Sequence, residues 1–220
     1  MAAREHPPIS DHPTFDYNAP HSSKVKIEDG MTVTQTPRAL ALVGMPGAGK
    51  TLCAKYLEAK GFFQFRFGSI VVNEVTRRGW AITPENERVV REELRRNEGM
   101  DVMAKRALPH LRAALESHPS IIIDGLYSFS EYKTLHHEFG GSVVVVAIIS
   151  PRALRYQRLA SREERPLTPE EAELRDYQEI EMLEKGGPIA MADYTLLNQG
   201  LSDDVLSDLD DLITALNLKS

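Results

Sequence analysis

The chain has 220 residues, of which 42% are hydrophobic, so it is long enough to bury a sizeable core in one or at most two domains. Its net charge of -6 argues against a protein built mainly to bind nucleic acid, because binding to a phosphate backbone requires clustered Lys and Arg. The single cysteine, Cys53, cannot form a disulfide within the chain, and no apolar run approaches the roughly 20 residues of a membrane span. The first residues carry charges and prolines instead of the apolar stretch of a secretion signal, so we expect a cytoplasmic protein.

Residues 1–37 show neither helical nor strand periodicity over most of their length. They contain five prolines, at positions 7, 8, 13, 20 and 37, and such segments are typical of loops. Three histidines also occur here, but they lie too far apart to indicate a metal site. We therefore predict a flexible arm over residues 1–37 and one folded domain over residues 38–220.

The first predicted strand is the continuous apolar run Ala39 to Val43, and a glycine-rich turn follows it directly. A helix is expected from about residue 50 to residue 60, because Gly61 stands where helices favour a left-handed C-terminal residue. The alternating segment Phe62 to Phe67 predicts a second strand.

Two helices are expected next. Thr83 and Pro84 predict the N-cap and the first turn of a helix that ends near Gly99. The second helix is expected over about residues 101–117, with a kink at Pro109.

Three more apolar runs predict strands, over residues 121–123, 143–149 and 194–197. Between the last two lies a charged helical stretch, residues 151–184, and leucines at helical spacing predict a final helix over residues 203–216. Strands that alternate with helices along a chain form parallel sheets with helices on both sides. The sequence therefore predicts a three-layer α/β fold.

The glycine-rich turn after the first predicted strand matches the phosphate-binding pattern GxxxxGK[ST] in full. Its residues are Gly44, Met45, Pro46, Gly47, Ala48, Gly49, Lys50 and Thr51. Glycines let backbone N–H groups surround phosphate oxygens, and the N-terminus of the next helix favours negative charge. Lys50 is expected to bridge the β- and γ-phosphates of ATP, and Thr51 to bind Mg²⁺. The alternative, a tight strand-to-helix turn, gives no reason for the Lys-Thr pair.

Asp124 directly follows the predicted strand 121–123. In open parallel sheets, ligands bind in the crevice outside the carboxyl ends of the strands. We therefore predict that Asp124 binds Mg²⁺ or acts on the acceptor hydroxyl. The competing interpretation is an acidic residue that merely caps a strand end.

Arginines recur every three or four residues in one segment and then stop at the sequence Pro-Leu-Thr-Pro of residues 166–169. They are Arg152, Arg155, Arg158, Arg162 and Arg165. Guanidinium groups stabilise the charge of a transferring phosphoryl group, so at least two of these arginines are predicted to act in a lid over about residues 152–176. Surface solvation and ion pairs with nearby glutamates are the competing interpretations. A second basic group, between Arg77 and Arg96, is the predicted source of acceptor contacts.

Five features carry a family resemblance: GMPGAGKT, RRGWAITPENERVVREELRRNEGMDVMAKRALPHL, IIIDGLYS, the arginine series followed by Arg175-Asp176, and MADYTLLNQG. Together they resemble the small P-loop kinases of the adenylate-kinase and dephospho-CoA-kinase type, and among these a dephospho-CoA-kinase-like subfamily. The resemblance extends from about Leu40 to the C-terminus. It implies a P-loop NTPase sheet, a helical acceptor-binding segment and an arginine-rich lid.

By position, the resemblance implies phosphate and Mg²⁺ contacts from Lys50 and Thr51, and an acidic group near the acceptor at Asp124. It further implies lid arginines, which are Arg158, Arg162 and Arg165. Asn198 falls in the loop that lies near the nucleotide base in such kinases.

Two departures from the family pattern concern the acceptor side. First, Gly68 is followed by Ser69 to Val72, where the family commonly has Asp and then Arg. Second, the Asp-Gly motif of the family, here Asp124-Gly125, commonly continues to an Arg, and Tyr127 stands in that place. The sequence predicts an ATP-dependent phosphotransferase that uses Mg²⁺ and a small nucleotide-like acceptor, of the nucleoside monophosphate or dephospho-CoA type, without membrane or nucleic-acid partners. The alternative is a nucleotide-binding regulatory ATPase or switch that lacks a small-molecule acceptor.

Overall fold

The computed structural model describes residues 37–163 and 165–220. Its strands form a five-stranded sheet in the order β2-β3-β1-β4-β5, in which all neighbouring strands are parallel. The strands are β1 (Ala39–Val43), β2 (Phe63–Arg66), β3 (Ile121–Asp124), β4 (Val143–Ile149) and β5 (Tyr194–Leu197). The predicted parallel sheet is confirmed, whereas the predicted arm lies outside the described residues except for Pro37.

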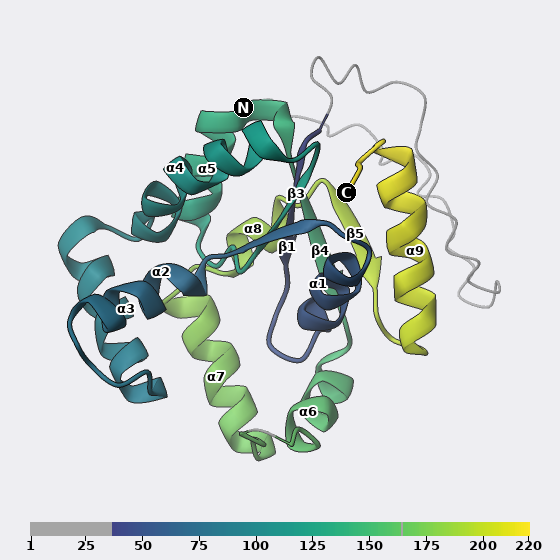
Figure 1. Cartoon of the computed structure of the whole chain (residues 1–220). Helices are drawn as coiled ribbons and strands as arrows, with labels where there is room; N and C mark the ends of the chain where they lie inside the picture. Colours follow the sequence, from purple (N-terminus) through teal and green to yellow (C-terminus); the bar gives the residue numbers. More distant parts are fainter. Residues whose placement is uncertain (1–36, 164) are drawn as a thin grey trace, which may run out of the picture.

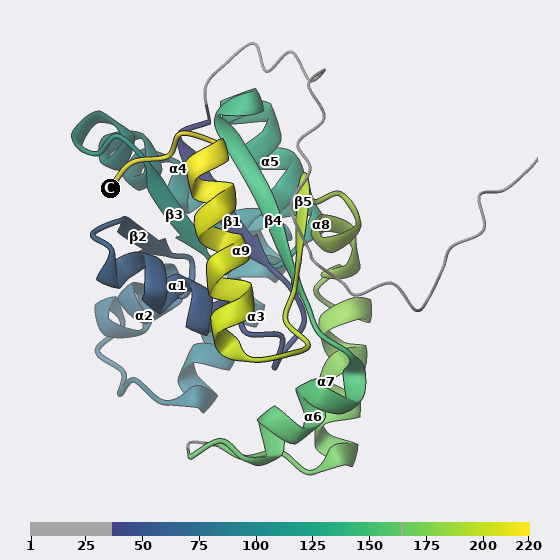
Figure 2. The same cartoon turned by 90° about the vertical axis from the view of Figure 1, so that its right-hand side faces the viewer.

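Helices cover both faces of this sheet, which confirms the predicted three-layer α/β fold (Figures 1 and 2). One face is covered by α1 (Lys50–Ala59) and α9 (Ser202–Ala215). The opposite face is covered by α2 (Gly68–Arg77), α3 (Pro84–Glu98), α4 (Val102–Ser117), α5 (Phe129–Phe139) and α8 (Gly186–Ala190), and the 3-10 turn η1 (Gly140–Ser142) leads into β4. Two helices, α6 (Arg152–Ala160) and α7 (Pro169–Glu181), lie beyond the end of the sheet, at the bottom of both views. Within residues 37–163 and 165–220, no helix is both long enough and apolar enough to cross a bilayer.

Strand β1 shows how the sequence builds the two cores. Successive side chains of a strand point to opposite faces of the sheet. Ala39, Ala41 and Val43 pack with the helices of one face, and Leu40 and Leu42 pack with α1 and α9 on the other. Burial of apolar surface on both faces explains why this strand is an uninterrupted apolar run.

The N-caps show where local sequence determines the helices. Thr83 begins α3 and accepts a hydrogen bond from the Asn86 N–H at 3.2 Å, as predicted. Thr168 begins α7 in a capping box with Glu171, whose carboxylate accepts the Thr168 N–H at 2.8 Å. Residues 166–169, predicted to interrupt the charged helical stretch, therefore lead into the next helix.

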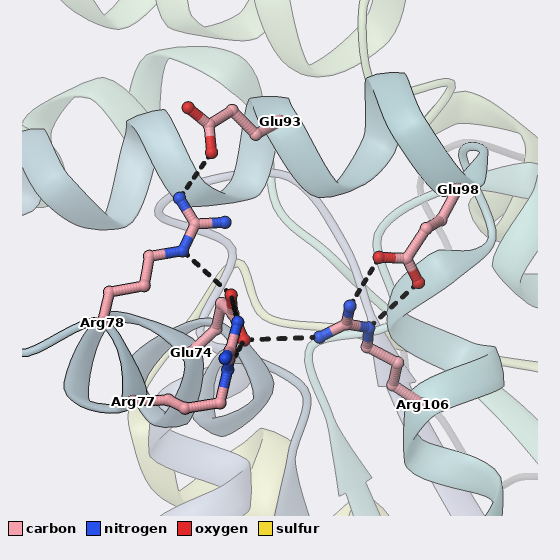
Figure 3. A network of polar contacts seen from close by, with 6 residues as sticks. All are labelled: Glu74, Arg77, Arg78, Glu93, Glu98 and Arg106. Carbon is pink, nitrogen blue, oxygen red and sulfur yellow. Dashed lines mark hydrogen bonds and ion pairs between the residues drawn. The ribbon is translucent and has the colours of Figure 1, made fainter.

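A buried carboxylate, Glu74, lies in a network of ion pairs that joins α2, α3 and α4 (Figure 3). Its side chain accepts hydrogen bonds from Arg77, the last residue of α2, and from Arg78, which caps that helix, at distances between 2.7 and 2.9 Å. These bonds lower the pKa of Glu74 to about 2. Arg78 also reaches Glu93 of α3, and Arg106 of α4 lies 3.7 Å from Glu74. Arg78 thus joins α2 to α3, and Arg106 joins α4 to α2, whereas the exposed Arg77 pairs with Glu74 of its own helix.

The order of the strands places a crevice at the end of β1. From β1 the chain continues to β2 and β3 on one side of the sheet, and β4 and β5 lie on the other side. Ligands of open parallel sheets bind where the strand order reverses in this way. The glycine-rich turn of residues 44–51, from here on called the P-loop, follows β1. Asp124 is the last residue of β3, the strand next to β1.

Candidate functional site

The P-loop connects β1 to α1 through three glycines with positive φ, Gly44, Gly47 and Gly49. Gly49 has φ 108, and a Cβ atom added there would lie 2.1 Å from Nδ2 of Asn198. Both the backbone conformation and the lack of space therefore require glycine. The loop is closely packed, because the Asn198 amide donates to the Ala48 carbonyl at 2.9 Å.

Lys50 at the start of α1 folds back over the loop. Its ammonium donates to the Gly44 carbonyl at 2.6 Å and to the Met45 carbonyl at 3.2 Å. Burial, with repulsion from Lys185 as the next cause, lowers the pKa of Lys50 to about 7. The cavity next to this lysine therefore favours an incoming anion, which would stabilise the charged ammonium.

A cavity of about 370 Å³ adjoins the P-loop and brings together several predicted site residues. It is lined by Pro46, Gly47, Gly49, Lys50, Thr51, Asp124, Tyr127, Arg158, Arg162, Arg175, Glu179 and Lys185. The Lys and Arg side chains outnumber the two carboxylates in this lining, so the cavity suits a polyanion.

Asp124 lies at the carboxyl end of β3 and contributes one of the two carboxylates. Its Oδ2 atom is 4.0 Å from Nε of Arg66, the paired residue on β2. Burial raises the pKa of Asp124, and Lys50 and Arg66 oppose this shift. Between residues 37 and 220, Glu164 excepted, no group of three or more His, Cys, Asp or Glu side chains could hold a metal by itself. A cation at Asp124 would therefore need further ligands, such as the Thr51 hydroxyl, phosphate oxygens or waters.

The arginine series does not share one helix face, because α6 ends at Ala160. Arg155 is buried and binds Asp176 of α7 and the Pro46 carbonyl. Arg158 lines the cavity but is also held by Ser150 at 2.9 Å and by Asn198 at 3.0 Å.

The remaining members of the series differ in position. Arg162 lines the cavity, and burial and then repulsion from Arg175 lower its pKa. Arg165 is exposed, has φ 54, and is not among the residues that line the cavity. Asn198 is buried behind the P-loop, between Ala48 and Arg158, and does not reach the cavity surface. The roles predicted for Arg165 and Asn198 therefore remain predictions without support from this arrangement.

Sequence reasoning did not identify three residues of the cavity wall. Lys185 forms an ion pair with Glu179, and its ammonium lies 4.6 Å above the ring of Tyr127. Tyr127, noted from the sequence only as a departure from the family pattern, is half-buried and lines the cavity. Lys185 and Glu179 belong to no short motif, so only their positions in the fold associate them with the P-loop.

A second, smaller cavity of about 110 Å³ adjoins the first. Three side chains line both cavities, namely Tyr127, Arg175 and Glu179. The rest of its wall combines apolar groups and two arginines from the second basic group: Phe67, Gly68, Val71, Arg91, Arg95, Met103 and Leu183.

Arg95 is the most unusual residue of this second cavity. Its side chain is 8% exposed, and its Nη2 atom lies 3.6 Å from Oε1 of Glu131, beyond hydrogen-bond distance. Neither Nε nor Nη2 has a hydrogen-bond partner within residues 37–163 and 165–220. Arg95 is therefore a buried cation that faces the carboxylate of Glu131 in an ion pair without a hydrogen bond, an arrangement that is unfavourable for a buried guanidinium.

Comparison with known proteins gives the family. A family model described as an AAA domain matches residues 40–180. A UPF0200 protein from Thermococcus gammatolerans is 37% identical over 166 residues, which cover 74% of this chain and 87% of that protein. The chain belongs to the UPF0200 family and carries an AAA domain. The more specific dephospho-CoA-kinase-like assignment stays a prediction.

Solved structures similar to this UPF0200 protein include small-molecule kinases. The shikimate kinase from Bacteroides thetaiotaomicron matches with a TM-score of 0.54 and 17% identity, over 82% of this chain and 99% of that one. A gluconokinase from Sinorhizobium meliloti matches with a TM-score of 0.51 and 14% identity, over 83% and 95% of the two chains. At such low identity the likeness concerns the fold, which is that of P-loop kinases.

Proposed function

We propose that the protein is a phosphotransferase that moves the γ-phosphoryl group of Mg-ATP to a small nucleotide-like acceptor. The observation that carries this proposal is the pair of adjoining cavities with a shared wall. The P-loop lines one cavity, and buried Arg95 lines the other, so donor and acceptor would meet beside Tyr127, Arg175 and Glu179.

The residues of the P-loop cavity have the chemistry that phosphoryl transfer requires. Lys50 would contact the β- and γ-phosphates, and Arg162 and Arg175 would stabilise charge on the transferring group. The bond from the γ-phosphorus to the β–γ bridging oxygen breaks, a bond to the acceptor oxygen forms, and ADP leaves. With a hydroxyl acceptor, Asp124 would take the acceptor proton or hold Mg²⁺, but not both at once, because a carboxylate bound to a divalent cation is a poor base.

Thr51 and Asp124 fit a site for Mg²⁺, because a hydroxyl and a carboxylate line the same cavity. Magnesium in such enzymes is commonly bound by one or two protein oxygens, substrate phosphates and waters. When bound, the ion would neutralise charge on the β- and γ-phosphates.

The second cavity supports an acceptor with an anionic group. Arg91, Arg95 and Arg175 surround a space large enough for a phosphate-sized group, and Phe67, Val71 and Met103 give it apolar walls. Arginine forks bind phosphate and carboxylate oxygens with paired hydrogen bonds. A nucleotide combines such an anion with a planar aromatic base, whose faces can pack on apolar side chains.

An acceptor screen tests this proposal directly. Purified protein with Mg-ATP is offered nucleoside monophosphates, the matching nucleosides and dephospho-CoA, and phosphorylated products are identified by mass spectrometry. We expect phosphorylation of at least one phosphate-bearing acceptor and none of the nucleosides. In the same assay, Arg95→Gln should raise the acceptor KM by about 10- to 100-fold, the effect of losing a charged hydrogen bond, with little change in the KM for ATP.

Arg96→Gln is the matched control for Arg95→Gln, because Arg96 is the exposed neighbour on the same helix. An equal effect of both substitutions would contradict the assigned acceptor cavity. Hydrolysis of ATP without any phosphorylated acceptor would favour a regulatory ATPase.

Binding of ATP should also be coupled to proton uptake by Lys50. At pH 8 this amine, with a pKa of about 7, is mostly neutral in the ligand-free protein. In the ligand-free protein, burial and the cations Lys185 and Arg162 lower the pKa of Lys50, and the carboxylates of Glu179 and Asp124 partly offset this shift. Bound phosphates add further negative charge and therefore raise the pKa of Lys50. We therefore expect uptake of about one proton at pH 8, little at pH 6, and weaker binding as the pH rises above 7.

Calorimetry in buffers of different ionisation enthalpy measures this uptake. Lys50→Arg is the matched variant, since Arg stays charged at both pH values and should remove most of the uptake. Equal uptake by the two proteins would show that another group is protonated.

A further inference from the structure

Lys185 is a buried cation in the wall of the P-loop cavity. It lies in the turn between α7 and α8, and only 2% of the residue is exposed. No sequence motif includes it, and the mechanism proposed above does not use it. Its backbone N–H donates to the Glu179 carbonyl at 3.0 Å, which fixes the turn against the end of α7.

Lys185 directly contacts one carboxylate and one aromatic ring, and Arg175 and Glu131 are further charged groups that act on it. Its ammonium forms an ion pair with Glu179, whose carboxylate also lies 3.7 Å from Arg175. The ring of Tyr127 lies against one side of the ammonium, with its centroid 4.6 Å from Nζ of Lys185. An ammonium has three N–H donors, so this arrangement leaves capacity for a further acceptor in the cavity.

Lys185 lines the P-loop cavity beside its junction with the second cavity. Both of its partners, Glu179 and Tyr127, line the P-loop cavity and the acceptor cavity. Lys50 and Lys185 line the same cavity, and Lys185 has the largest influence of any charged group on the pKa of Lys50. A phosphoryl group that passes from donor to acceptor has to cross this junction.

A purely structural role explains these facts less well. A buried Lys–Glu pair loses hydration on folding and adds little net stability, so well-packed apolar residues would serve at least as well. The pair also holds Lys185 in the same cavity as Lys50, and the two like charges repel. Binding of a polyanion between them relieves that repulsion.

We propose that Lys185 is a second phosphate-binding lysine, which contacts the transferring γ-phosphoryl group opposite Lys50. In the ligand-free protein Glu179 holds the ammonium in place, and the phosphate oxygens become an additional acceptor for it on binding. This proposal rests on the proposed phosphotransferase function, because it assigns Lys185 to the group that moves.

Affinities for two nucleotides test the proposal without a known acceptor. The probes are the non-hydrolysable analogue β,γ-imido-ATP, which has a γ-phosphoryl group, and ADP, which lacks it, both with Mg²⁺. Lys185→Met should weaken binding of the analogue about 10- to 100-fold and of ADP by a much smaller factor. Lys185→Arg, which keeps the charge, should recover part of the loss.

Two further variants separate this role from stability. Lys133→Met is the matched control, because Lys133 also lies over an aromatic ring, Phe129, at 5.0 Å but outside the cavity; it should bind both nucleotides as the wild type does. Lys185→Met with Glu179→Gln removes both charges, avoids an unpaired buried carboxylate, and should still lose the preference for the analogue over ADP.

Two results would overturn the proposal. Wild-type preference for the analogue in the double variant would show that Lys185 only neutralises Glu179. Equal weakening of both nucleotides by Lys185→Met would place the ammonium away from the γ-position. If the wild type phosphorylates no acceptor, the proposed function fails, whereas these binding measurements still decide the role of Lys185.

Discussion

Lys50→Ala is expected to lower kcat/KM for phosphoryl transfer from ATP by about 10²- to 10³-fold or more, the effect of removing a preorganised donor from developing charge. The ammonium already lies on the P-loop, bonded to the carbonyls of Gly44 and Met45, so it is held next to the expected phosphate position. Its removal takes away a charge that binds the β- and γ-phosphates together. The measurement is steady-state turnover with Mg-ATP and the acceptor found in the screen.

The fold should survive this substitution, because the Lys50 amine is bonded to carbonyls of the P-loop and lies in no hydrophobic core. The thermal unfolding midpoint should stay within a few degrees of the wild type. Lys55→Ala is the matched control, since Lys55 is exposed on the same helix, and we expect its turnover to be unchanged. Unchanged turnover in Lys50→Ala would refute the assignment of the P-loop as the ATP site.

The strands of the sheet could be predicted because their signal is local. Val143–Ile149 is buried along nearly its whole length, and such strands require continuous apolar runs that are visible in the sequence. The P-loop could be predicted for a similar reason, since its glycines and Lys50 are adjacent along the chain. Asp124 followed from the general rule for strand ends, and it does lie in the P-loop cavity.

The remaining parts could not be predicted because they depend on packing between distant segments. Helix α5 is a separate case, because its capping box is a local signal for where it begins, but its few buried residues give only a weak helical periodicity. Lys185 and Lys50 are far apart in the sequence and meet only through the fold. Arg155 belongs to a regular series of arginines, yet the partner that buries it, Asp176, lies on the following helix.

Arg155→Met is expected to destabilise the protein by about 3–5 kcal/mol, because breaking a buried ion pair leaves an uncompensated charge at Asp176. Both side chains of this pair are 8% exposed, and the guanidinium binds both carboxylate oxygens, at 2.9 and 2.5 Å. The same guanidinium donates to the Pro46 carbonyl at 2.9 Å. The variant should therefore lose nucleotide affinity as well as stability, and urea unfolding and nucleotide titration measure the two effects.

A double variant separates these effects. Arg155→Met with Asp176→Leu removes both charges, so most of the lost stability should return, as it does when apolar residues replace a buried pair. The Pro46 carbonyl still lacks its donor, so nucleotide affinity should stay low. Arg152→Met is the matched control, because Arg152 lies on the same helix in an exposed pair with Glu173 at 3.7 Å and should change stability little. Full recovery of both stability and affinity in the double variant would show that Arg155 does not support the P-loop, whereas recovery of stability alone would assign it both roles.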